Sequence, residues 1–240
     1  MYGIEIINLR AIGNYSISLS DSQLKFSLIC SLSEEVLFRS SDVSRWIYIS
    51  SGHGEIKNFK RQIISVTEQN LVYLPPHEEI SIFPILKTSF EIVVIEVPNY
   101  GSDSKKEVIT FSKSNKNIDW FGPWISQLST TTIHLALTGN DNSKVDKPLH
   151  FHRKTIEAYY VAHGSTTMMI RNVSNKVILS EGHLLIVKPG VPHGMDLKEE
   201  INGVVNYAGL VVKIPTELIT PVDPNDKFAS DNDIRYNQTL

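Results

Sequence analysis

Two histidines in the second half of the chain, His150 and His152, are separated by a single residue. Side chains of an extended segment alternate between the two faces of the strand, so these imidazoles point to the same side. Imidazole nitrogens are common ligands of divalent transition metals. The pair therefore indicates a metal-binding strand, although two alternating histidines also occur on half-exposed strands that bind nothing.

A glutamate follows the histidine pair, at Glu157. Its position has the opposite parity to the histidines, so an unbroken strand would turn its carboxylate to the other face. Residues 153–155 are polar and are typical of a turn or bulge, which can reset the alternation. With that reset, the carboxylate of Glu157 returns to the face that carries the histidines.

The spacing H-x-H-x4-E-x6-G ends at Gly164, and a second block, G-x6-P-G-x2-H, runs from Gly182 to His193. Together these blocks resemble the two signature motifs of the cupin superfamily. Proteins of that family bind one divalent metal inside a small β-barrel. The resemblance implies four ligands for such an ion, which are His150, His152, Glu157 and His193. Iron is the first candidate for the ion, with manganese, nickel and zinc as alternatives.

One position of the second block departs from the family pattern. The family has a proline two residues before the glycine, whereas Lys188 stands there and Pro189 directly precedes Gly190. The departure affects the predicted turn and leaves all four ligand positions intact.

Composition limits the classes of function. The chain has 240 residues, 41% of them hydrophobic, and a formal net charge of -3. This length and hydrophobic content suit a globular chain with a sizeable core, while the thinly spread Lys and Arg argue against nucleic acid as a partner. The opening residues do not form a secretory signal and no segment is long enough to span a bilayer, so we expect a cytoplasmic protein. Cys30, the one cysteine, is expected to be buried.

Most apolar runs are short, β-branched or aromatic, and bounded by turn residues. Such runs predict an all-β fold, and the cupin resemblance makes it a double-stranded β-helix, or jelly roll. Only residues 117–121 and 215–219 read as short helical segments. The polar stretches 101–106 and 112–117 are the best candidates for a linker.

The linker position suggests two similar halves. Residues 46–56 and 71–77 repeat the strand and turn pattern of the signature blocks without the histidine pair, and His77 takes the place of His193. The chain therefore resembles a bicupin. We expect a metal-free barrel over residues 1–112 and a metal-binding barrel with a polar tail over residues 113–240.

Alternation also predicts which side chains surround the ion. Tyr159 shares the parity of Glu157, Met195 and Leu197 share that of His193, and Tyr207 is a candidate on the last strand. They would form a mostly apolar wall suited to a small organic molecule. Tyr159 is one candidate catalytic residue. His134, on a predicted strand beside the barrel, is the other if it faces inward.

Three function classes remain open for such a site. Three imidazoles and a carboxylate leave two positions free on an octahedral ion, as an oxygen-dependent dioxygenase or oxidase requires. The same ion could polarise a carbonyl for an isomerase, epimerase or lyase. The third class is a non-catalytic cupin that binds a small ligand. We favour the dioxygenase-type oxidoreductase, because the named inner residues offer no strong general base.

Assembly is less constrained by the sequence. Cupin barrels commonly pair, and residues 4–9 or the polar tail 223–240 could lie across a neighbouring chain. Two barrels in one chain could instead cover that pairing surface by contacting each other. A monomer and a homodimer are both compatible with the sequence.

Overall fold

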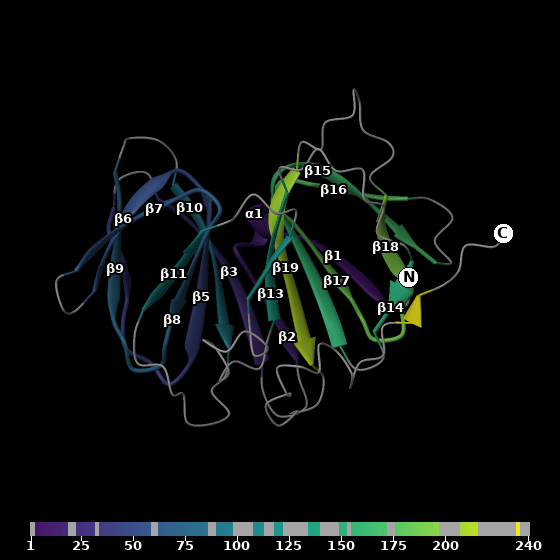
Figure 1. Cartoon of the computed structure of the whole chain (residues 1–240), viewed down its shortest axis with the longest axis horizontal. Coiled ribbons are helices and arrows are strands. Elements are labelled where there is room, and N and C mark those ends of the chain that lie inside the picture. The colour runs from purple at the N-terminus through teal and green to yellow at the C-terminus, as the bar shows by residue number, and fades with distance from the viewer. Residues whose placement is uncertain are drawn as a thin grey trace. The chain divides into compact units, whose positions relative to one another are not determined.

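The structure is a computed structural model (Figure 1). It describes residues 3–18, 23–31, 34–58, 62–85, 90–97, 108–112, 118–121, 134–139, 149–152, 155–171, 176–196, 207–215 and 234–235. Nearly all of these residues lie in β-strands, which confirms the predicted all-β class. Leu9–Ser114 forms one compact unit, and Met1–Asn8 with Asn115–Leu240 forms the other. We call them the N-terminal and the C-terminal unit.

The N-terminal unit is built from two antiparallel sheets. A six-stranded sheet has the order β11-β8-β5-β10-β3-β2, and a four-stranded sheet has the order β4-β9-β6-β7. The strands are β2 (Asn14–Ser18), β3 (Gln23–Ser31), β4 (Val36–Phe38), β5 (Ser44–Ser51), β6 (His53–Asn58), β7 (Ile63–Thr67), β8 (Asn70–Leu74), β9 (Ile80–Pro84), β10 (Phe90–Val97) and β11 (Ile109–Ser112). Alternate residues of both sheets form one buried apolar cluster that includes Phe38, Ile47 and Ile80.

The C-terminal unit contains the longest strand of the described chain, β15 (Thr155–Ile170). Its first half pairs with β17 (His183–Val187) and β19 (Tyr207–Pro215), and its second half with β16 (Val177–Ser180) and β18 (His193–Asp196). The remaining strands are β1 (Ile4–Asn8), β12 (Ile118–Phe121), β13 (His134–Gly139), β14 (His150–Phe151) and β20 (Ile234–Arg235). One strand thus contributes to both sides of the barrel, around a single apolar core.

The first strand belongs with the C-terminal unit. All five residues of β1 pair with β17, from Ile4 opposite Val187 to Asn8 opposite His183. The expected division at residues 112 and 113 assigned this segment to the N-terminal barrel. Pairing within the chain gives residues 4–8 a role that does not require a neighbouring molecule.

The predicted helix at residues 117–121 was wrong. Residues 118–121 form strand β12, which pairs with β13, because Ile118, Trp120 and Phe121 are as compatible with a strand as with a helix. Among the described residues, the helical segment is α1 (Leu9–Ile12), a single turn that precedes Gly13 and was not predicted. Of the second predicted helix, Pro215 ends β19 and residues 216–219 lie outside the described residues.

The thiol of Cys30 is exposed rather than buried. It lies on β3 opposite Glu91 of β10, and its Sγ is 3.7 Å from Glu91 Oε2. Partial burial and the nearby carboxylate raise the pKa of the Cys30 thiol above its ordinary value.

No helix in the part of the chain that the structure describes is long and apolar enough to cross a membrane.

Candidate metal centre

The four predicted ligands come together from three strands of the C-terminal unit. His150 lies in β14 and His152 follows it directly, Glu157 is the third residue of β15, and His193 begins β18. The Cα of His193 is paired with His150 on one side and with Ile170 of β15 on the other. The end of β15 therefore holds β18 beside β14, so two segments about forty residues apart present their imidazoles to one point.

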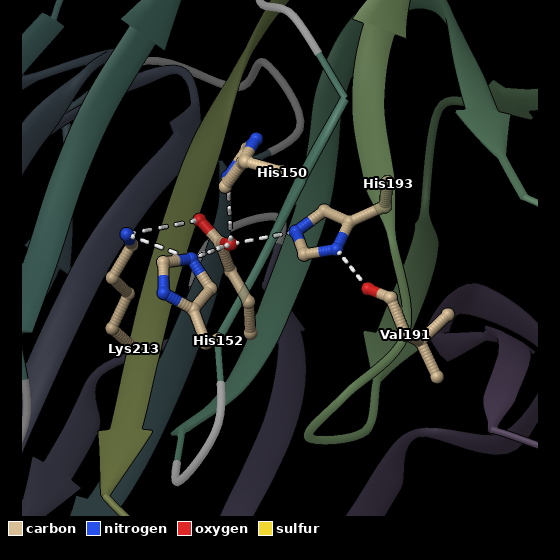
Figure 2. Close-up of polar contacts among 6 residues, drawn as sticks. His150, His152, Val191, His193 and Lys213 are labelled. Atoms are coloured by element: carbon tan, nitrogen blue, oxygen red, sulfur yellow. Dashed lines mark hydrogen bonds and ion pairs between the residues drawn. The ribbon is translucent and has the colours of Figure 1, made fainter. Parts of the chain in front are cut away.

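The ligand atoms of these four residues all lie within 4.8 Å of one another (Figure 2). Glu157 Oε2 is at the centre, 2.8 Å from His193 Nε2, 3.0 Å from His152 Nε2 and 3.9 Å from His150 Nε2. His152, Glu157 and His193 are buried, while the side chain of His150 is 13% exposed. A donor set of three nitrogens and one oxygen at this spacing suits one divalent transition metal.

A second hydrogen bond fixes how His193 presents its ring. Its Nδ1 lies 2.8 Å from the carbonyl oxygen of Val191, and a carbonyl can only accept, so Nδ1 carries the proton. In the neutral ring, the lone pair is then on Nε2, the atom that faces Glu157. Metal-binding histidines characteristically donate their other nitrogen to a carbonyl or carboxylate in this way. The residues present therefore fit a metal ion.

The turn that carries His193 depends on a glycine. Gly190 has a φ of 80°, in the left-handed region that favours glycine. Its N–H donates to the carbonyl oxygen of His152 at 2.7 Å, which joins the two ligand segments through their backbones. The left-handed backbone at Gly190 thus explains why the second signature block has a glycine there. The turn forms although the proline stands at position 189 and not at 188.

A lysine that was not predicted from the sequence lies beside the ligands. Lys213 in β19 is paired with Glu157, is 5% exposed, and places Nζ 3.1 Å from His152 Nε2 and 3.9 Å from Glu157 Oε1 (Figure 2). Burial by itself raises the pKa of Glu157, but the charge of Lys213 and hydrogen bonds with His152 and His193 hold it well below its usual range. The carboxylate is therefore ionised, as a metal ligand requires. In the sequence, Lys213 could have been singled out because it is the one charged residue within the apolar run of residues 207–215.

Three of the four residues that were predicted to surround the ion are buried in the C-terminal unit. Tyr159, Met195 and Tyr207 all belong to the buried core cluster of the C-terminal unit, and the Tyr159 ring is 6.0 Å from that of His193. Leu197 lies outside the described residues. The backbone of His134 pairs with Lys213, whereas its side chain is outside the described part of the structure. The catalytic roles of Tyr159 and His134 stay predictions.

Tyr207 is held in the neutral form by its surroundings. Its hydroxyl is 2.5 Å from Thr138 Oγ1, and burial, partly offset by that hydrogen bond, raises the pKa of Tyr207 to about 12. At neutral pH its phenol therefore acts as a hydrogen-bonding group and not as a base.

We expect Tyr207→Phe to lower the free energy of unfolding of the C-terminal unit by about 1–3 kcal/mol, because the buried Thr138 hydroxyl loses its partner. Urea unfolding of the two single variants and of the double variant with Thr138→Val measures the coupling. The double variant should recover most of the loss, since both polar groups are then removed. Equal losses that simply add would show that the two hydroxyls do not interact.

The N-terminal unit has other residues at the corresponding positions. Phe38 is paired with Ile80 and Arg45 with Glu96, as His150 is paired with His193 and Glu157 with Lys213. The separation of Phe38 from Arg45 equals that of His150 from Glu157. Phe38 and Ile80 are buried core residues, and Arg45 Nε forms an ion pair with Glu96 Oε1 at 3.1 Å. None of these four side chains makes a metal site.

His77 does not take the position of His193 in this unit. It lies in a turn with a φ of 65°, its side chain is 71% exposed, and its Nδ1 is 3.6 Å from Asp42 Oδ1. The register assigns the position of His193 to Ile80. The alignment of residues 71–77 with the second signature block was therefore wrong at its end: five residues separate β8 from β9, as five separate β17 from β18, so Ile80 and not His77 takes the position of His193.

Comparisons with known proteins support the fold. No protein-family model matches the chain, and no curated protein matches it. Among solved structures, the protein Ylba from E. coli has a TM-score of 0.65 at 10% identity, with 90% of this chain and 93% of that chain covered. Oxalate decarboxylase from Bacillus subtilis, described with Mn(II) centres, has a TM-score of 0.55 at 13% identity over 90% of this chain and 74% of that one. A cupin 2 conserved barrel domain protein from Leptotrichia buccalis has a TM-score of 0.53 at 12% identity, covering 89% and 98%.

Proposed function

We propose a function on the premise that this chain has the cupin fold: its C-terminal unit is a metal-dependent enzyme that acts on a small organic metabolite. The observation that carries the proposal is the convergence of His150, His152, Glu157 and His193 within 4.8 Å. A purely structural ion has little purpose here, because the N-terminal unit builds its β-fold with Phe38, Arg45 and Ile80 in its place.

A divalent ion in this site would supply a Lewis acid with open positions for substrate oxygens, and iron or manganese would add redox chemistry. The protein contributes orientation and exclusion of water. Val191 fixes the tautomer of His193, and Lys213 keeps Glu157 ionised. Tyr159 and Met195 are buried in the core of the same unit, with the Tyr159 ring 6.0 Å from that of His193, and a low-dielectric environment strengthens electrostatic interactions.

An oxygen-dependent oxidoreductase, of the dioxygenase or oxidase type, is the first candidate. Such an enzyme needs two adjacent open positions and a wall that keeps bulk water away from reactive intermediates. The buried and mostly apolar surroundings of Glu157 and His193 support this candidate.

A lyase, isomerase or epimerase is the second candidate, and Lys213 is the observation that favours it. A proton-moving enzyme needs an acid or base beside the ion that is not itself a ligand. The amine of Lys213 lies 3.1 Å from a ligand nitrogen, and the neutral phenol of Tyr207 is less suited to the task. The likeness in fold to an oxalate decarboxylase makes manganese a metal to include in the test.

Turnover with and without oxygen distinguishes these candidates. The protein is loaded anaerobically with Fe(II) or Mn(II) and given a panel of small hydroxy and keto acids. We expect product only after oxygen is admitted, with oxygen consumed in proportion to substrate. Full anaerobic turnover would reject the oxidoreductase and support the lyase or isomerase. Tight binding without any turnover would reject both and leave a non-catalytic ligand-binding cupin.

A further inference from the structure

Lys213 brings a positive charge to a site that already attracts a cation. The side chain is 7% exposed and lies on β19, directly opposite the metal ligand Glu157 on β15. Its charge is balanced in the structure by Glu157, whose Oε1 is 3.9 Å from Nζ. The carboxylate of Glu157 and the ammonium of Lys213 thus offset each other.

Binding of a divalent ion changes this balance. The ion adds two positive charges, so the ion, Glu157 and Lys213 together carry a net charge of about +2 inside a barrel lined by apolar side chains. Burying uncompensated charge is costly, and an anion that enters with the ion lowers that cost. A neutral ligand cannot do so.

The hydrogen bond of Lys213 changes as well. Lys213 Nζ lies 3.1 Å from His152 Nε2, and a His152 whose Nε2 lone pair is bound to a metal ion has none left to accept from Lys213. In the metal-bound site, the ammonium of Lys213 therefore needs an acceptor other than His152. Besides Glu157 Oε1 at 3.9 Å, an oxygen of a ligand bound to the same ion would lie within reach, because Nζ is already 3.1 Å from a ligand atom of that ion.

We propose that Lys213 makes the metal site selective for carboxylates, by binding one oxygen of a small carboxylate ligand whose other oxygens bind the ion. The two open positions favour a carboxylate with an adjacent hydroxyl or keto oxygen, since such a ligand chelates. The inference rests on the proposed function and names its substrate class, small 2-hydroxy or 2-keto acids.

The corresponding pair in the N-terminal unit provides a matched control. Arg45 is paired with Glu96 as Lys213 is paired with Glu157, with the two charges exchanged between the strands. Phe38 and Ile80, two buried apolar residues, take the positions of His150 and His193 in that unit. Arg45→Met therefore removes a cation of similar burial without touching the proposed site.

The experiment measures glycolate binding to the full chain loaded with Mn(II), by calorimetry and by the Mn(II) electron paramagnetic resonance spectrum. Glycolamide, which is neutral and of similar shape, is the control ligand. We expect Lys213→Met to weaken glycolate binding about 10- to 100-fold, the range for a charge-assisted hydrogen bond, and to leave glycolamide unchanged. Lys213→Arg should keep part of the affinity, and Arg45→Met all of it.

Metal affinity separates a ligand-binding role from a structural one. Removing a positive charge beside the ion should leave Mn(II) binding equal or tighter in Lys213→Met, whereas a lysine that only positions Glu157 and His152 would loosen it when removed. Lys213→Gln provides a second variant if the methionine variant does not fold. Unchanged glycolate affinity in a folded, metal-loaded variant overturns the inference, as does a wild type that does not prefer glycolate to glycolamide. Failure of the wild type to bind Mn(II) would instead reject the proposed function.

Discussion

Replacing His152 by alanine is expected to reduce the affinity of the chain for Mn(II) or Fe(II) by at least about 100-fold, because even residues behind the metal ligands typically contribute 10–100-fold. His152 is 1% exposed and its Nε2 lies 3.0 Å from Glu157 Oε2, so no water enters easily to take its place. Competition with a chelator of known affinity measures the change. Circular dichroism should show a folded β protein in the variant.

His77→Ala is the control for this result. His77 is an exposed imidazole of the N-terminal unit and makes its ion pair with Asp42. The control variant should bind the metal as the wild type does. Retained affinity in His152→Ala, or an equal loss in both variants, would contradict the assignment of the ligands.

Gly209→Ala is expected to destabilise the C-terminal unit by about 3 kcal/mol or more, at the upper end of overpacking effects. A Cβ at Gly209 would clash with the backbone oxygen of Tyr160 and would lie 3.2 Å from the Tyr207 ring. The first of these atoms belongs to β15, the strand paired with β19, and it cannot move without shifting the ladder. Thermal unfolding followed by circular dichroism measures the loss.

Gly190→Ala separates a steric clash from backbone strain. Gly190 has a φ of 80° and nothing within 4 Å of an added Cβ, so only the left-handed backbone should matter. We expect a cost of about 1 kcal/mol there. If Gly209→Ala were no more costly than Gly190→Ala, the close approach of β19 to β15 at this point would be wrong.

The sequence predicted the fold class and the meeting of four residues because both depend on local patterns. Short β-branched runs specify strands, and the spacing of His150, His152 and Glu157 already places them on neighbouring segments. His193 was found only through the resemblance of its glycine and proline turn to a family motif. These features lie within a few residues of one another or repeat a known pattern.

The remaining features depend on pairing between distant strands. Lys213 is 56 positions beyond Glu157, and only the register of β15 with β19 shows that the two residues are opposite each other. The pairing of β1 with β17 joins segments even further apart. Both are tertiary contacts that no local periodicity encodes. The alignment of His77 with His193 was three positions short, because five residues separate β8 from β9 as they separate β17 from β18.

The amount of metal in the purified chain tests the central claim most directly. After equilibration with Mn(II) or Fe(II) and removal of the weakly bound ion, elemental analysis should give about one metal per chain, because only the C-terminal unit carries a ligand set among the described residues. The residues at the corresponding N-terminal positions, Phe38, Arg45 and Ile80, offer no such set. Two metals per chain, or none retained by the wild type, would contradict the account.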